Sequence, residues 1–286
     1  MLQIQSLAPE SSKVWRGQLE LEFRAGPEKT QLVHPRTKAP LRVLRPHYPE
    51  DSGRCYTTIV HTAGGLVGGD QLEQTIRLQP KAQVLLTTAA ASKVYLSIGP
   101  TARQSTHLSL GNHANLEWFP QETIVFNGAN YHQSLQINLD PDATVLLWEI
   151  TRFGRSARGE RFLTGQWRSD LEVWQAGIPV WIDRQCLTGD AVALDSPHGL
   201  QGCPVVGTLA FVGRPATPTI LDTLQRLAIE TEIPTTQIGI TENLNGFVCR
   251  YRGDSSQIAR QYFIAVWQYL RHTWYGRMPS RPRVWL

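Results

Sequence analysis

The sequence has few of the residues that build catalytic and metal-binding centres. It holds only 4 cysteines in 286 residues, and none of them forms a Cys-x-x-Cys pair. The 8 histidines never fall at His-x-His or His-x-x-x-His spacing, so no two imidazoles share one face of a strand or helix. We therefore expect no high-affinity transition-metal site. Dispersed free thiols are typical of a reducing compartment, and we expect a cytoplasmic protein.

The chain also lacks the segments that mark membrane and secreted proteins. Its apolar stretches, such as residues 143–148, are far shorter than the roughly 20 residues of a membrane-spanning helix. The N-terminus, MLQIQSLAPE, has neither the basic start nor the apolar core of a signal peptide. The net charge of +4 favours acidic partners but is too small to require nucleic acid. We expect neither a membrane nor a nucleic acid as partner.

Glycine is concentrated in one loop, HTAGGLVGGD, which runs from His61 to Asp70. The pairs Gly64-Gly65 and Gly68-Gly69 indicate sharp bends or a close approach of another backbone. The loop lacks the Lys-Ser/Thr of a P-loop and the Gly-x-Gly-x-x-Gly of dinucleotide sites. A tight turn between strands is the simpler interpretation. An enzyme that binds a phosphate or a small molecule here, with His61 and Asp70, stays open as an alternative.

Alternating apolar and polar residues over the first two thirds of the chain predict many short strands. Residues 17–23, 71–78, 103–110 and 131–139 alternate, whereas residues 84–88 and 143–150 are apolar enough for burial on both faces. Turn residues separate these runs at short intervals. We therefore predict a mainly β structure without a visible internal repeat.

Two helices are predicted near the C-terminus. The first follows Thr217 as N-cap and has Pro218 at its first position. The second begins with Asp254 as N-cap, has Gln257 three residues later and runs through Trp274. Its many aromatic side chains cover more than one face, which favours core packing with some rings left for a partner.

Arginine recurs at every third residue from Arg152 to Arg161, in TRFGRSARGERF. Gly154 and Gly159 make a continuous helix unfavourable, so the segment is predicted to be a loop. Its guanidinium groups fit carboxylates or phosphates, and a basic RNA-binding module is one alternative. Glu160 and other nearby acids would repel phosphate, which favours internal ion pairs or a protein partner.

The glycine loop resembles the signature of the urease accessory protein D family, and other segments match that family in the same order. They are TTAAASKVYLS (87–97), EWFPQETIVFNGA (117–129), FGRSARGERF (153–162) and PRVW (282–285). The resemblance implies a single domain over residues 1–286, with many short strands in stacked, helically wound layers and two α-helices near the C-terminus. It also implies a non-catalytic chaperone that binds apo-urease and helps to insert nickel. Its implied partners are accessory protein F and, through the complex, the GTPase accessory protein G.

The family motifs supply the candidate partner-binding or passage-lining residues. These candidates are Gly64, Gly65, Gly68, Gly69, Asp70, Glu122, Arg155, Arg158 and Glu160. The only metal ligands we expect are His61 and Asp70, for weak and transient Ni²⁺ binding. No tightly bound cofactor and no catalytic residue is predicted. A carboxylate beside glycines commonly caps a turn, and this simpler role stays open for the acidic candidates.

Overall fold

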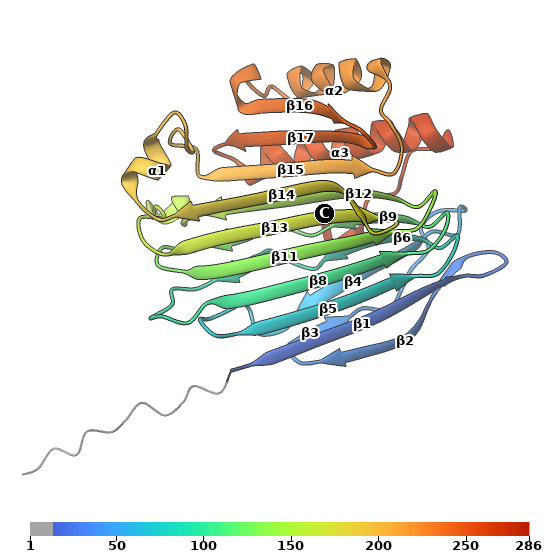
Figure 1. Cartoon of the computed structure of the whole chain (residues 1–286), viewed down its shortest axis with the longest axis horizontal. Helices are drawn as coiled ribbons and strands as arrows, with labels where there is room; N and C mark the ends of the chain where they lie inside the picture. Colours follow the sequence, from blue (N-terminus) through green and yellow to red (C-terminus); the bar gives the residue numbers. More distant parts are fainter. Residues whose placement is uncertain (1–13, 286) are drawn as a thin grey trace, which may run out of the picture.

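Two large β-sheets face one another along most of the chain (Figure 1). The computed structural model describes residues 14–285, so the N-terminal segment MLQIQSLAPE, which was searched for a signal peptide, lies outside the described residues. Within that range, sheet A has seven strands in the spatial order β14-β13-β11-β8-β5-β1-β2. They are β1 Arg16–Ala25, β2 Thr30–Lys38, β5 Gln71–Leu78, β8 Ala102–Leu110, β11 Asn130–Leu139, β13 Gln166–Gln175 and β14 Ile178–Thr188.

Sheet B has ten strands over the same described residues, and its main path runs β16-β17-β15-β12-β9-β6-β4-β3. Two short strands, β7 and β10, lie off this path. The strands are β3 Leu41–Val43, β4 Cys55–His61, β6 Gln83–Thr88, β7 Ser92–Val94, β9 Asn115–Phe119, β10 Thr123–Val125, β12 Thr144–Phe153, β15 Val205–Val212, β16 Ile238–Asn243 and β17 Gly246–Gly253.

The chain alternates between the two sheets and therefore winds as a coil. Strands β1, β5, β8, β11 and β13 pair in parallel in sheet A, and β4, β6, β9 and β12 pair in parallel in sheet B. Strands β2, β5, β8, β11 and β14 of sheet A are each followed along the chain by a strand of sheet B, which gives a β-solenoid of about 4 turns. This confirms the predicted mainly β fold of stacked, wound layers.

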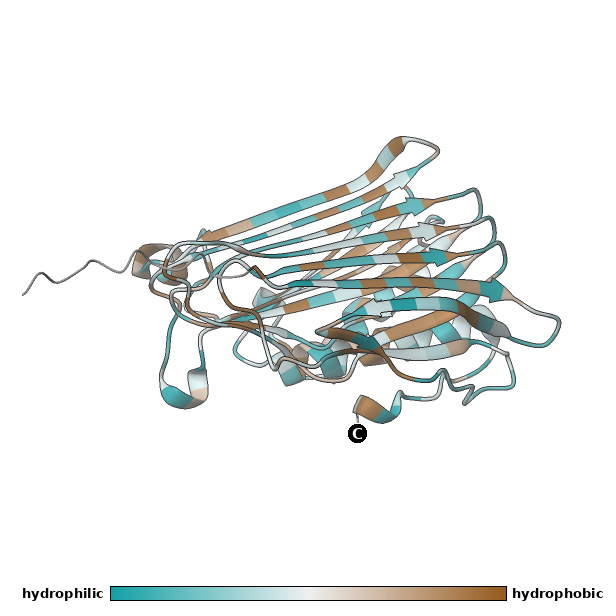
Figure 2. Cartoon of the chain, turned by 90° about the horizontal axis from the view of Figure 1, so that it is seen from below, coloured by the Kyte–Doolittle hydropathy of each residue, from teal (hydrophilic) through white to brown (hydrophobic). Residues whose placement is uncertain are grey.

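Equivalent side chains of successive coils stack in rows between the sheets. One row lies at matching register positions of five strands and is buried throughout: Leu21, Ile76, Leu108, Ile137 and Val173. Outward neighbours are polar, and Figure 2 shows hydrophobic and hydrophilic residues alternating along these strands. Because the side-chain period of a strand is two, the alternation fixes which face meets the core.

Helices α2 Pro218–Glu230 and α3 Ser256–Tyr275 cover the outer face of sheet B (Figure 1). The short helix α1 Ala191–Asp195 lies beyond the ends of the strands, and its Leu194 packs into the core between the sheets. Short 3₁₀ turns occupy Ser156–Arg158, Thr235–Gln237 and Arg283–Trp285. None of the helices in residues 14–285 is long and apolar enough to cross a membrane.

Helix caps confirm one predicted start and correct the other. Thr217 accepts a bond from the Ile220 N–H at the start of α2, with Pro218 next to it, as predicted. The predicted Asp254 cap of α3 is wrong, because Ser255 is the residue that accepts the Ile258 N–H. The two alternatives are adjacent polar residues, and only the backbone geometry decides between them. The short helix α1 has no counterpart among the predicted elements.

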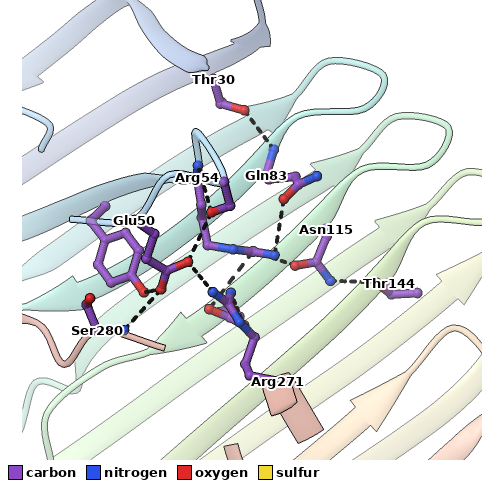
Figure 3. Close-up of polar contacts among 11 residues, drawn as sticks. Thr30, Glu50, Arg54, Gln83, Asn115, Thr144, Arg271 and Ser280 are labelled. Carbon is purple, nitrogen blue, oxygen red and sulfur yellow. Dashed lines mark hydrogen bonds and ion pairs between the residues drawn. The ribbon is translucent and has the colours of Figure 1, made fainter. Parts of the chain in front are cut away.

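A buried ion cluster fastens α3 and the C-terminal segment to sheet B (Figure 3). Arg271 of α3 donates to Glu117 of β9 at 3.2 Å and pairs with Glu50. Arg54 lies 3.9 Å from the other Glu117 oxygen, and Glu50 accepts the Ser280 N–H at 3.1 Å. Burial raises the pKa of Glu50, but its bond from Tyr56 and the charge of Arg271 outweigh this and lower it overall. Such a cluster links segments far apart in sequence, and losing one partner would leave a buried charge uncompensated.

Candidate functional site

A third, short ladder joins the coils at one end of the sandwich. Leu66 bridges to Val94 of β7, β7 pairs with β10, and β10 pairs with the last residues of β12. We call this ladder, formed by residue 66 and residues 92–94, 123–125 and 151–153, the corner ladder. Its inward side chains, Leu66, Val94, Val125 and Phe153, form a buried stack. The corner ladder gives each coil a third short side, so the sheets are held apart at this end.

The corner ladder gathers four family motifs that the sequence separates. Leu66 of the glycine loop forms the first position of the ladder. The motifs 87–97 and 117–129 contain its next two strands, β7 and β10, and the motif 153–162 begins at Phe153, the last residue of β12. The fifth motif lies close by, because Trp285 donates to Thr87 at 2.9 Å and packs on Phe119. The motifs therefore mark one end of the coil, which we call the wide end.

A cavity of about 180 Å³ lies between the sheets at the wide end. At the opposite, narrow end the strands are joined by tight turns at residues 79–82, 111–114 and 140–143. The cavity wall includes Gly64, Gly65 and His61 of the glycine-loop segment. It also includes residues 88–93, on the chain that leads into the corner ladder.

Polar side chains line much of this cavity. They come from the sheet A strands β5, β8 and β11 and from the sheet B strand β12, and include Gln74, Gln104, Thr106, Gln133 and Glu149. Gln74 is 5% exposed, and its side-chain oxygen has no partner among the described residues. A buried polar atom without a partner is costly unless water or a ligand satisfies it. The cavity is therefore suited to a hydrated or polar guest.

Glu149 is the acidic group of the cavity. Its Oε2 accepts bonds from Gln133 at 3.0 Å and Ser169 at 3.2 Å. Burial raises the pKa of Glu149 to about 7, and the negative charge of Asp183 adds to the rise, while these bonds and Arg250 oppose it. The carboxyl group can therefore gain or lose a proton close to neutral pH, which is typical of functional sites.

Polar contacts continue from Glu149 beyond the cavity. Thr208 of β15 lies at the register position next to Glu149, and Arg250 of β17 lies next to Thr208. Arg250 donates to Thr208 at 2.9 Å and to Asp183 of β14 at 2.7 Å. Polar groups thus run between the sheets from the cavity toward the last strands of the coil.

The glycine loop forms one wall and a tight corner. Gly64 and Gly65 line the cavity, and a Cβ on Gly65 would come within 2.6 Å of the Lys93 carbonyl oxygen. Gly68 and Gly69 form the turn into β5 and do not line the cavity. A Cβ on Gly68 would lie 2.1 Å from the Ser97 hydroxyl oxygen, so a neighbouring coil requires glycine at this position.

Asp70 caps this turn by accepting the Val67 N–H at 2.9 Å. The Asp70 carboxylate thus accepts a loop N–H, which is the simpler role that the sequence left open for it. His61 lines the cavity, and burial lowers its pKa while the charge of Asp70 partly opposes the shift. The histidine is therefore neutral near pH 7 and has a free ring nitrogen for a metal.

The other candidate residues lie in ion pairs around the corner ladder. Glu122 pairs with Arg260 of α3, and Glu160 pairs with Arg155 and accepts the Asn127 N–H at 3.2 Å. The bond from Arg155 lowers the pKa of Glu160. Arg158 alone of this set is exposed without an acidic partner in the described range. The pairing of Arg155 with Glu160 agrees with internal ion pairs, one of the two interpretations favoured for the arginine segment, the other being a protein partner.

No group of three or more His, Cys, Asp or Glu side chains within residues 14–285 could hold a metal ion. Glu149, the acidic group of the cavity, is missing from the residues predicted from the sequence. A signal was present, because Glu149 is a charged residue inside the apolar run of residues 143–150. Its inward direction depends on the pairing of β12, which the local pattern does not contain.

Comparison with known proteins agrees with the motif positions. A profile of the UreD urease accessory protein family matches residues 16–286. The chain belongs to the UreD urease accessory protein family. It is 50% identical over 273 residues to the urease accessory protein UreD of Nostoc sp., covering 96% of both chains. The corresponding protein of Thermosynechococcus vestitus is 47% identical over 273 residues, with 95% of this chain and 98% of the relative covered.

More distant members match over nearly the same length. The protein of Synechocystis sp. is 38% identical over 258 residues, covering 90% of this chain and 95% of the relative. Like the rest of the UreD family, this chain is a non-catalytic factor in urease maturation. The alternative of an enzyme centred on the glycine loop is therefore wrong.

Proposed function

We propose that this chain holds apo-urease in a receptive state and passes Ni²⁺ through the polar interior at its wide end. The observation that carries the proposal is the cavity of about 180 Å³, ringed by the family motifs and containing Glu149 and His61. One carboxylate and one neutral imidazole, without a cluster of ligands, give weak and reversible binding. A factor that must release its metal needs this property.

Accessory protein F and the GTPase accessory protein G complete the proposed system in the cytoplasm. A separate GTPase is required because the glycine loop here has no P-loop lysine and directs its Val67 N–H to Asp70. The polar groups from Glu149 to Asp183 support a route along the interior of the coil. Asp70, Glu122, Arg155, Arg158 and Glu160 would then shape or surround the entrance and do not form a metal site.

Titration of the purified chain with Ni²⁺ at pH 6 and pH 8 tests the metal part of the proposal. We expect a dissociation constant of about 1 μM or weaker, which is about −8 kcal/mol or less favourable. Binding should be tighter at pH 8, because Glu149, with a pKa of about 7, loses its proton and His61 is neutral. Glu149→Gln should remove most of this pH dependence, and Glu242→Gln on the exposed edge strand β16 is the matched control.

Nickel loading of apo-urease by the complete accessory system tests the delivery part. Wild type and Glu242→Gln should load urease equally, whereas Glu149→Gln should reduce the nickel content of urease severalfold. Equal loading by Glu149→Gln would show that the interior route is not used. A nanomolar site insensitive to changes at Glu149, His61 and Asp70 would indicate different ligands and a storage role.

A further inference from the structure

Two rows of polar side chains face one another inside the coil. One row keeps a single register position across the sheet A strands β8, β11, β13 and β14, and the other does so across the sheet B strands β12, β15 and β17. We call them the sheet A polar row, which is Gln104, Gln133, Ser169 and Gln185, and the sheet B polar row, which is Glu149, Thr208 and Arg250. Inward positions of a strand are ordinarily apolar. A register position that stays polar from strand to strand therefore lines the interior along the coil axis.

Hydrogen bonds join the two rows across the interior. Gln133 and its neighbour in the sheet A polar row donate to Glu149, and the Gln185 amide donates to the Thr208 hydroxyl oxygen at 3.4 Å. Arg250 donates to the same oxygen at 2.9 Å. Neighbouring strands are about 4.7–4.9 Å apart, so the polar contacts extend about 10 Å from Gln133 to Gln185. The rows thus connect the main cavity, which Gln133 and Glu149 line, with the last strands of the coil.

The rows end at an ion pair that reaches the surface. Arg250 donates to the Asp183 carboxylate of β14 at 2.7 Å, and Gln185 donates to the same carboxylate at 2.8 Å. The Arg250 side chain is 42% exposed, whereas that of Asp183 is only 11% exposed. In Figure 1, β14, β17 and β16 lie at the end of the stack opposite β2. The guanidinium therefore closes the rows at the place where the interior of the coil meets solvent.

The last strand of sheet B carries no side chain beside Arg250. The register position next to it on β16 is Gly239, where an added Cβ would meet only the Cβ of Arg250, at 4.0 Å, among the described residues. The Arg250 side chain can therefore turn away from Asp183 without displacing a side chain at that position. Burial is the main cause of the raised pKa of Glu149, and beyond it the charge of Asp183 raises this pKa while that of Arg250 lowers it. The ion pair and the carboxyl group of the cavity are thus electrostatically coupled.

We propose that Arg250 is a displaceable plug at a second mouth of the interior. A divalent cation that moves along the rows replaces the guanidinium at Asp183, and Arg250 turns into the open space beside Gly239. Asp183 has a cationic partner before and after the exchange, so no step leaves a mostly buried carboxylate uncompensated. The inference rests on the proposed function, because it names the residue that closes the far end of the interior route.

Titration of the purified chain with Ni²⁺ at pH 8 tests the exchange, because the guanidinium and the metal compete for Asp183. Arg250→Met keeps a long unbranched side chain and removes the competing charge, so Ni²⁺ should bind about fivefold more tightly. Arg250→Lys retains a cation and should change the affinity by less than about twofold. Arg184→Met is the matched control and should also have little effect, since Arg184 of β14 pairs with Glu172 at 2.7 Å on the outer face of sheet A.

A double-mutant cycle assigns the gain in affinity to Asp183. In the Asp183→Asn background, Arg250→Met should leave the Ni²⁺ affinity unchanged, because the carboxylate that the metal would gain is absent. Urea unfolding of each variant shows whether the pair also stabilises the last coil. If Arg250→Met lowers stability but binds Ni²⁺ like wild type, the pair only fastens β14 to β17 and the inference is wrong.

Arginine modification of the wild-type chain gives a readout that needs no variant. Phenylglyoxal reacts with accessible guanidinium groups, and peptide mapping by mass spectrometry reports each site separately. Ni²⁺ should increase the modification of Arg250 severalfold and leave that of Arg184 unchanged. Unchanged or reduced modification of Arg250 at saturating Ni²⁺ would overturn the inference.

The outcomes separate the plug from the proposed function. If Glu149→Gln impairs the loading of urease while Arg250→Met binds Ni²⁺ like wild type, the plug fails and the interior route stands. If Arg250→Met binds Ni²⁺ more tightly while Glu149→Gln loads urease normally, the metal reaches Asp183 from solvent, so the exchange at Arg250 stands and the interior route fails. If wild type binds no Ni²⁺, both are overturned.

Discussion

The two ends of the coil are built from the same strands, yet their interiors differ. At the narrow end, rows such as Leu78, Leu110 and Leu139 stack between tight turns and are buried. Toward the wide end, the inward faces of the same strands carry Gln74, Gln104 and Gln133, and a cavity separates the sheets. The corner ladder causes the difference, because it adds a third side to each coil.

This comparison shows how a solenoid can combine stability with a polar interior. Each coil buries its apolar side chains against the next, so the narrow end stabilises the stack by repeated contacts. Polar side chains at the wide end then need only satisfy one another and water. The glycine loop and the ion pairs of the arginine segment hold the outside of that end in place.

Cavity formation at the narrow end should have the largest effect. Leu108 is 0% exposed, and Leu108→Ala should lower the free energy of unfolding by about 2–5 kcal/mol. Gln104→Ala, four residues earlier beside the existing cavity, should cost less than about 1 kcal/mol, because little packing is lost. Urea unfolding measures both, with Ser109→Ala on the outer face as control. Equal losses at residues 104 and 108 would remove the distinction between the two ends.

Replacement of Glu149 should stabilise the wide end at high pH. The folded-state pKa of Glu149 is about 7 against an ordinary value of 4.5. Between these values the unfolded chain releases the proton and the folded chain retains it, so wild-type stability falls as pH rises. Glu149→Gln should therefore be more stable than wild type at pH 8, by at most about 3 kcal/mol, and equal to it at pH 4.

Unfolding of the two proteins at several pH values checks this difference. Glu242→Gln, exposed on β16, should show no such divergence from wild type. A Glu149→Gln protein that loses stability at pH 8 would mean that the buried carboxylate is ionised and held by its neighbours. The wide end would then be a structural ion site and not a proton-dependent one.

A smaller effect is expected at the turns of the two ends. Asp70→Ala removes the acceptor of the Val67 N–H and should cost about 1 kcal/mol, whereas Asp140→Ala at a narrow-end turn should be nearly neutral. Asp70→Ala should also lower the pKa of His61 further, because the Asp70 charge now raises it. Chemical-shift titration of His61 follows that change. An unmoved His61 pKa would show that the two residues are not electrostatically coupled.

Much of the fold was predictable from local patterns. Alternation places Leu72, Ile76 and Leu78 on one face of β5, and the structure buries all three. Thr217 with Pro218 fixes the start of α2 through a short-range hydrogen bond. The site was harder to predict from the sequence. The glycine motif locates one wall of the cavity. Gln74 on the inward face of β5 is recognisable as part of the site only because the structure places it in the same cavity as Gln104 and Gln133 of later coils.

From the amino-acid sequence come the mainly β character, the strands with clear alternation and their inward faces, the cap of α2 and the family to which the chain belongs. These properties depend on periodicity and on neighbours a few residues apart. Tertiary structure alone decided that residue 66 and residues 92–94, 123–125 and 151–153 form one ladder, that a cavity opens behind it and that Glu149 faces that cavity. The register between coils comes from contacts between distant segments without a repeated sequence pattern, so only the folded chain contains it.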